Sequence, residues 1–327
     1  MIDDFGYLNA RIRVRRSRLI PEGFFFEALN LNFPELLKVL KESIYGPDLT
    51  GDSLSDIDRA VGVHFNRTVS DLPRLVSGKA HDAVTVLLMQ ADLANVKTVL
   101  RGKSLGWSAE EIGRHLEGGT LPRGLHRAMA EAPDAASLAQ ILSLPHHLLA
   151  RALREAIRAG HEQLELERLL DQIFYTEQLD WVNKLDQPCL TDFIRFEIDA
   201  LNLSTGVKLF TIGFEGLPDR FFLKGGRRVD LSLFRRLAGG ELSALQELRD
   251  SDFGRLAELR SLSAIEQGLR CALLAKAHKE ARDVLGAGLA IDYIKHKEWE
   301  GERIRLLARR AYYNLPAASI EEDVFCR

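Results

Sequence analysis

The stretch DLANVKTVLR, residues 92–101, decides the fold class because its pattern recurs along the chain. It places an acid, an Asn three residues later and then two basic positions four residues apart, all within a helical run of apolar residues. Three further copies occur at spacings of roughly one hundred residues: GYLNARIRVR (6–15), DALNLSTGVK (199–208) and EGERIRLLAR (300–309). Four copies delimit three intervals, so we predict three related units. Repeat architectures usually present surfaces and seldom carry a reaction centre.

On a helical wheel, the acid of the pattern lies inside the apolar stripe and the two basic positions lie on the opposite, solvent face. Val96 and Leu93 fall on the same side as Asp92. A carboxylate on a packed face is costly unless it is paired or hydrogen-bonded. We therefore predict that an Arg or free backbone N–H groups of a neighbouring helix bind each acid. The residues of this structural motif are Asn9, Asp92, Asn95, Asp199, Asn202 and Glu300.

The acid and Asn positions of the pattern are incomplete in two copies. Gly6 stands where the later copies have an acid, and Arg303 stands where they have Asn. The first and fourth copies therefore cannot each form the same contact alone, and we expect Glu300 to serve the N-terminal helix. An alternative use of the acids, lining a cavity or contacting a partner, stays open at this point.

Most long segments show the 3.6-residue period of an amphipathic helix, and strand alternation is nearly absent. The predicted fold is all-α, with long helices at 80–101, 148–159, 164–185, 192–209, 265–285 and 289–312. Pairs of short helices joined at Pro or Gly are predicted at 19–40, 121–142 and 229–248. We predict three similar helical domains related by approximate internal symmetry, comprising residues 1–110 (closed by 289–327), 111–210 and 211–288.

Composition excludes several classes of protein. The chain has 327 residues and a net charge of −3, so the arginines between residues 11 and 18 do not indicate a nucleic-acid binder. The three cysteines are few, odd in number and far apart, which argues against a disulfide framework and for a reducing, cytoplasmic setting. No run resembles a signal peptide, and no uninterrupted apolar stretch is long enough to predict a membrane span.

Signatures of catalysis and of cofactor binding are also missing. P-loop, nucleophile-elbow and kinase motifs do not occur. The adjacent His146 and His147 have no Cys, Asp or Glu at metal-ligand spacing, and we interpret them as turn residues after Pro145. The sequence therefore predicts no catalytic residue, no cofactor and no metal. The aromatic runs at 24–26 and 312–313 fit either the core or an exposed docking rim.

Six stretches in order along the chain resemble the C subunit of the bacterial and archaeal V/A-type rotary ATPase, the counterpart of the eukaryotic d subunit. They are YLNARIRVRR (7–16), DLPRLVSGKA (71–80), LDQPCLTDF (185–193), FFLKGGRRVD (221–230), LRCALLAKA (269–277) and KEWEGERIRLLARRAYYNLP (297–316). Each stretch is a weak signal alone. Together they cover the chain essentially from end to end.

The resemblance implies a non-catalytic rotor component in the shape of a funnel of three similar helical domains in a pseudo-three-fold arrangement. Such a protein caps the membrane ring of proteolipid subunits, receives the central shaft made by the D and F subunits, and transmits torque for proton-coupled ATP synthesis or hydrolysis. Localisation would be cytoplasmic, on the inner face of the plasma membrane, without a direct membrane span. Candidates for lining the funnel or meeting a partner are the basic residues of the motif: Arg11, Arg15, Lys97, Arg101, Lys208, Arg305 and Arg309.

Two other functions stay open. The chain could be a free-standing helical-repeat scaffold that binds soluble proteins, which predicts a concave groove with no affinity for a proteolipid ring. It could also be a small-molecule enzyme that uses a carboxylate such as Asp92, which predicts a solvent-reachable pocket containing that carboxylate and a basic partner.

Overall fold

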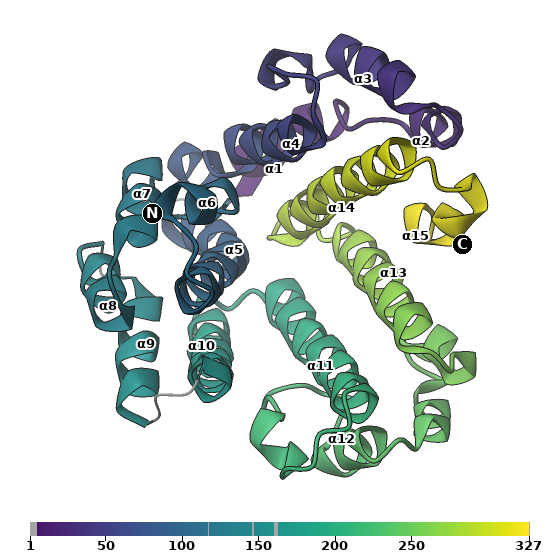
Figure 1. Cartoon of the computed structure of the whole chain (residues 1–327). Helices are drawn as coiled ribbons and strands as arrows, with labels where there is room; N and C mark the ends of the chain where they lie inside the picture. The colour runs from purple at the N-terminus through teal and green to yellow at the C-terminus, as the bar shows by residue number, and fades with distance from the viewer. Residues whose placement is uncertain (1–4, 117, 146, 160–162, 327) are drawn as a thin grey trace. The chain divides into compact units, whose positions relative to one another are not determined.

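The computed structural model describes residues 5–116, 118–145, 147–159 and 163–326. Within these ranges it contains helices and turns and no β-strand, so the predicted all-α class is confirmed (Figure 1). The long predicted helices are present as α5 (Gly78–Ser104), α9 (Leu148–Ala159), α10 (Gln163–Leu185), α11 (Pro188–Thr211), α13 (Leu262–Glu280) and α14 (Gly288–Tyr312).

Helix α13 ends earlier than its apolar period suggests. The carboxylate of Asp283 accepts hydrogen bonds from the backbone N–H groups of Leu285 (3.2 Å) and Gly286 (3.0 Å). This Asx-type turn gives the chain an alternative to helical hydrogen bonding, so the segment before α14 is a loop.

The chain divides into two compact units, and the boundaries fall inside α5 and α13. The first unit comprises residues 1–84 and 277–327. Its remaining helices are α1 (Phe5–Arg16), α2 (Glu22–Ala28), α3 (Phe33–Glu42), α4 (Leu54–Val69) and α15 (Glu321–Val324). One hydrophobic core joins both ends of the sequence, because Leu36 and Leu40 of α3 belong to the same cluster as Ile304 and Leu307 of α14.

The second unit comprises residues 85–276. Its shorter helices are α6 (Ala109–Arg114), α7 (Arg123–Glu131), α8 (Ala135–Ser143) and α12 (Leu231–Ala238). A core cluster contains Leu203 and Val207 of α11, Phe234 of α12, and Leu245 and Phe253 of the segment that follows. The division into three domains remains a prediction.

Helix α5 is the one helix of the described ranges that is long and apolar enough to cross a membrane by length and composition. Of its most hydropathic window, 67% is buried inside the protein. A helix that packs most of this window against its own chain, and carries Asp92 in that packed face, has the character of a core helix.

Cys189 is buried with a free thiol, and the expectation of a reducing, cytoplasmic setting remains a prediction.

Candidate functional site

The three acids of the recurring motif are fully buried. Asp92 on α5, Asp199 on α11 and Glu300 on α14 are each 0–1% exposed. Each carboxylate binds the segment that begins one of the short-helix pairs, and we call each set of contacts a latch. In the second unit the acid and its backbone donors lie 28 to 30 residues apart.

The Asp199 latch consists of backbone donors. The N–H groups of Arg227 (2.9 Å) and Arg228 (3.0 Å) donate to Oδ2, and that of Val229 (3.0 Å) donates to Oδ1. Gly226 permits this approach, because a Cβ at that position would lie 2.0 Å from Asp199 Oδ1. Burial raises the pKa of Asp199, and the three backbone hydrogen bonds oppose the rise.

The Asp92 latch adds side chains. Thr120 donates from its backbone N–H (2.9 Å) and its hydroxyl (2.7 Å) to Oδ2, and the N–H of Leu121 reaches Oδ1 at 3.4 Å. His147 Nε2 lies 3.1 Å from Oδ2. Because His147 Nδ1 accepts a hydrogen bond from the N–H of Leu149 (3.2 Å), Nε2 carries the proton and donates to the carboxylate.

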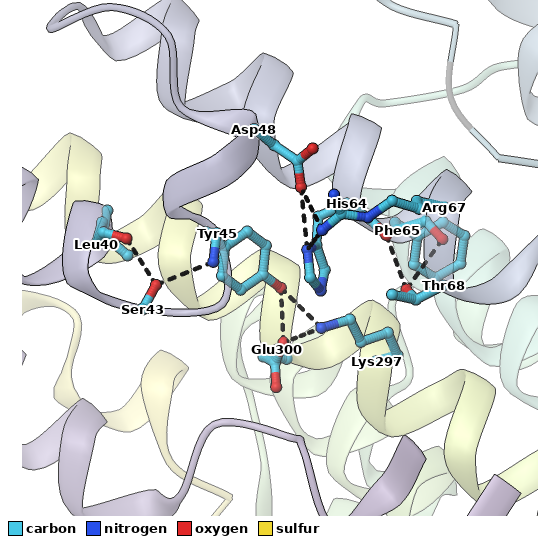
Figure 2. Close-up of polar contacts among 10 residues, drawn as sticks. All are labelled: Leu40, Ser43, Tyr45, Asp48, His64, Phe65, Arg67, Thr68, Lys297 and Glu300. Carbon is cyan, nitrogen blue, oxygen red and sulfur yellow. Dashed lines mark hydrogen bonds and ion pairs between the residues drawn. The ribbon is translucent and has the colours of Figure 1, made fainter. Parts of the chain in front are cut away.

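The Glu300 latch relies mostly on side chains. The backbone N–H of Ile20 donates to the carboxylate at 2.6 Å. The hydroxyl of Tyr45 also donates to it at 2.6 Å, and Lys297, which is 2% exposed, forms an ion pair with it (Figure 2). Burial lowers the pKa of Lys297, and Glu300 opposes that shift. Burial also raises the pKa of Tyr45 well above its ordinary value, and the negative charge of Glu300 adds to the rise.

A second group of polar side chains lies beside this latch. His64 contacts Asp48 (3.2 Å), and Arg67 forms an ion pair with Asp48 at 2.9 Å (Figure 2). The rings of His64 and Tyr45 pack against each other with centroids 4.4 Å apart. Burial, followed by the charge of Lys297, lowers the pKa of His64 to about 4, so the imidazole is neutral near pH 7.

Tyr45 and His147 each follow a short-helix pair and bind the acid of their latch, and Phe253 follows the third pair. In the turn before Tyr45, Ser43 Oγ donates to the carbonyl of Leu40 (2.7 Å) and accepts from the N–H of Tyr45 (3.2 Å). Ser251 makes the same two bonds, to the carbonyl of Leu248 (2.7 Å) and from the N–H of Phe253 (3.1 Å). Phe253 has no polar group to offer, and in that repeat backbone donors complete the latch.

Two of the Asn side chains of the motif form hydrogen bonds with backbone groups of other segments. Asn202 both donates to and accepts from the backbone of Leu223, at 2.8 Å in each case. Asn9 donates to the carbonyls of Val284 (3.0 Å) and Gly286 (3.1 Å), which places α1 against the loop before α14. Asn95 is buried. Arg303, in the place of an Asn, instead stacks its guanidinium 3.6 Å from the centre of the Phe25 ring.

Most of the basic candidates pair with acids of their own unit. Arg15 binds Asp71 through two hydrogen bonds of 2.7 and 2.8 Å. The other pairs are Lys97 with Asp171, Arg101 with Glu167, Lys208 with Glu266 (2.7 Å), and both Arg305 (3.6 Å) and Arg309 (3.1 Å) with Asp58. On α5 this differs from the predicted solvent face, since Lys97 has a side chain only 19% exposed and points at α10.

The aromatic runs divide between core and surface. Phe25 is fully buried. Phe26 is 43% exposed and stacks on Phe325, and Tyr312 and Tyr313 are 53% and 63% exposed. Among the described residues no group of three His, Cys, Asp or Glu side chains is arranged to hold a metal ion.

Known proteins identify the family of this chain. A family model described as ATP synthase (C/AC39) subunit matches residues 8–323. The chain belongs to this family. The V-type ATP synthase C subunit of Thermus thermophilus is 48% identical over 326 residues, with 100% of each chain covered. The protein of the same name from Deinococcus radiodurans is 31% identical (99% of this chain, 92% of the relative), and the A-type ATP synthase C subunit of Haloferax volcanii is 26% identical (97% and 96%).

Within this C/AC39 family member, the sequence pattern locates the acids and misses their donors. It indicates turn residues at the histidine pair, whereas His147 binds Asp92; His146 lies outside the described residues. The motif does not single out Tyr45 at all. A usable signal exists, because SIYG (43–46) and SDFG (251–254) both follow a short-helix pair and share the Ser-x-aromatic-Gly pattern.

Proposed function

We propose that this chain is the non-catalytic central-stalk rotor component of a V/A-type rotary ATPase or ATP synthase. In this role it links the shaft formed by the D and F subunits to the proteolipid ring and transmits torque for proton-coupled ATP synthesis or hydrolysis. The observation that carries the proposal is the end-to-end match to the family, over residues 8–323, and to the V-type ATP synthase C subunit over full length.

The geometry supports a mechanical role. A torque-bearing protein has to resist relative motion of its helices under load. Each latch fastens a long helix to the start of a short-helix pair through three or four donors, and its acid is 0–1% exposed. Buried, fully bonded carboxylates hold a geometry strongly, because opening them leaves polar groups unpaired.

The same contacts argue against catalysis by these carboxylates. A general acid or base needs a proton that substrate can reach, and a substrate cannot approach a carboxylate that is 0–1% exposed and already occupied by the donors of its own chain. We therefore propose that the chain has no active site of its own, contains no cofactor, and is peripheral on the inner face of the plasma membrane within the complex.

Gene deletion with complementation tests this proposal. In the native host, the affinity-tagged chain should co-purify with the D and F subunits of the shaft and with the proteolipid ring. Membranes from the deletion strain should lose shaft attachment and ATP synthesis, and the tagged chain should restore both. Unchanged shaft attachment and ATP synthesis after deletion would refute the proposal.

The same purification distinguishes the scaffold alternative. A free-standing scaffold predicts recovery of soluble proteins without any other component of the ATPase. As a control for catalysis, the isolated chain should show no ATP hydrolysis above buffer, whereas the whole complex purified through the same tag should hydrolyse ATP.

A further inference from the structure

The first copy of the motif differs from the others in how its basic residues are used. In the copies on α5, α11 and α14, every basic side chain at the two basic positions forms an ion pair with an acid of the same unit. On α1, Arg15 pairs with Asp71, and the neighbouring Arg16 pairs with the buried Asp292 at 2.9 Å. Arg11 is exposed and forms no ion pair within the described residues.

Helical geometry explains which arginines are engaged. The packed side of α1 contains Phe5, Leu8 and Ile12, all 0–3% exposed. Arg15 and Arg16 lie at the borders of this packed side, where acids of the same unit reach them. Tyr7, Arg11 and Val14, at i, i+4 and i+7, lie on the opposite side of the helix.

We propose that this opposite side of α1 binds an acidic amphipathic helix of a partner protein. The α1 face consists of Tyr7 (49% exposed), Arg11 and Val14 (56% exposed), and the exposed Arg18 follows just beyond the C-terminal end of the helix. Arg11 and Arg18 have no acid partner in the described part of their own chain, so both guanidinium groups are available to carboxylates of a partner. Arg also suits carboxylate binding in interfaces, since its planar fork forms two parallel hydrogen bonds.

A protein helix fits this face better than a membrane surface does. Stable insertion into a bilayer interface needs a continuous apolar side with several large residues. Here the apolar part is Tyr7 and Val14 alone, with a guanidinium between them. Two apolar residues and an intervening cation at i, i+4 and i+7 match a partner helix that carries apolar anchors and an acid at the same spacing.

The inference rests on the proposed function only for where the partner is found, namely in the assembled complex. The test replaces Tyr7 with the photo-crosslinking residue p-benzoylphenylalanine in the tagged chain, irradiates the native host cells and identifies the crosslinked peptide by mass spectrometry. The expected product is a helical segment of another protein with acids at i, i+3 or i+4. No crosslink, a crosslink to lipid, or a crosslink to a segment without acids would overturn the inference.

A charge exchange then tests the electrostatic part, with a synthetic peptide of the crosslinked segment as the probe. Arg11→Glu should weaken peptide binding about tenfold at low salt, less at high salt, and an acid-to-Lys change in the peptide should restore it. Lys38→Glu, the same charge change at an exposed position of α3, should leave binding unchanged. Equal binding by both variants, or no restoration, contradicts the proposal.

The two proposals fail in distinguishable ways. If the tagged chain recovers no other ATPase component, the proposed function fails, while the crosslinked peptide still decides what α1 binds. If the ATPase is recovered and Tyr7 gives no acidic helix, the proposed function stands and the assignment of α1 is wrong. Arg11→Glu and Lys38→Glu change exposed side chains that form no ion pair in the described ranges. We therefore expect the midpoint of thermal unfolding to stay unchanged in both variants.

Discussion

The Asp199 latch and the Glu300 latch occupy the same place in two repeats and use different chemistry. Three backbone N–H groups bind Asp199, whereas one backbone N–H, a tyrosine hydroxyl and a buried lysine bind Glu300. The receiving segments explain the difference. Gly226 lets backbone approach Asp199 closely, while residues 17–22 around Ile20 include no glycine and offer one N–H.

The two repeats therefore share the carboxylate that accepts the hydrogen bonds, whereas the groups that donate to it differ with the local sequence. A latch made of backbone donors is neutral apart from its acid and contains no other titratable group. A latch made of side chains brings a buried cation and a buried phenol with it. The two should therefore respond differently to truncation and to pH.

The largest expected effect is at Glu300. Glu300→Ala removes the partner of the fully buried Lys297 and of the Tyr45 hydroxyl, so we expect a loss of about 3–5 kcal/mol of unfolding free energy. Urea unfolding measures this loss. Adding Lys297→Met should recover part of it, because the uncompensated cation is then gone. A loss below about 1 kcal/mol in the single variant would mean that the side-chain latch carries little of the stability.

Acid should weaken the side-chain latch selectively. Burial holds the pKa of His64 at about 4 in the folded state, against about 6.5 unfolded, so the unfolded chain binds more protons between these values. Stability therefore falls as pH drops from 6.5 to 4, by about 3 kcal/mol at most. Measured by hydrogen exchange relative to the intrinsic rate at each pH, the protection of the Ile20 amide should fall more than that of the Val229 amide over this range.

The control for this pH dependence is His64→Gln, which removes the titrating group and should flatten the difference between the two amides. Equal loss of protection at Ile20 and Val229 in the unmodified chain would show that His64 does not set the acid sensitivity of the first unit. No change at either amide would lead to the same conclusion.

Whether the sequence predicts a feature of the two latches depends on how far apart in the sequence the contacting residues lie. Helical periodicity is local, and it predicts α9 and α14 to within one residue of their observed bounds. The wheel puts Asp92 among apolar side chains, and the side chain is 0% exposed. These features follow from neighbours within one or two turns of the same helix.

The donors cannot be predicted in the same way because they depend on tertiary contacts. Tyr45 and Glu300 are 255 positions apart in the sequence, and the local sequence pattern around either residue does not identify the other as its hydrogen-bond partner. The predicted solvent face of α5 holds for Arg101, whose side chain is 61% exposed, and is wrong for Lys97, since the wheel does not reveal that α10 brings Asp171 to that residue. Pairing between helices requires the fold.

At the backbone latch we expect a smaller effect than at Glu300. Asp199→Ala leaves three N–H groups without an acceptor but no buried charge behind, so unfolding free energy should fall by about 1–3 kcal/mol. Denaturation by urea, followed by circular dichroism, measures this change. A loss as large as that of Glu300→Ala would remove the distinction between backbone and side-chain donors.

Close approach at Gly226 can be tested separately. Gly226→Ala would place a Cβ 2.0 Å from Asp199 Oδ1, so we expect a loss of about 1–3 kcal/mol from the forced displacement. The matched control is Gly124→Ala in α7, where no atom lies within 4 Å of the added Cβ and a modest gain from helix propensity is expected. Similar midpoints of thermal unfolding for both variants would show that the Gly226 segment moves aside freely.

The smallest effects should come from the basic residues of the motif, which separates the latches from the ion pairs around them. Lys97 has a side chain 19% exposed beside Asp171, whereas Lys208 has one 52% exposed beside Glu266. We expect Lys97→Ala to cost up to about 1 kcal/mol and Lys208→Ala less than about 0.5 kcal/mol, because solvent screens the more exposed pair. Differential scanning calorimetry of both variants beside Asp199→Ala decides the order. If either lysine variant lost as much stability as Asp199→Ala, the charged faces of the motif helices would share the structural role that we assign to the acids.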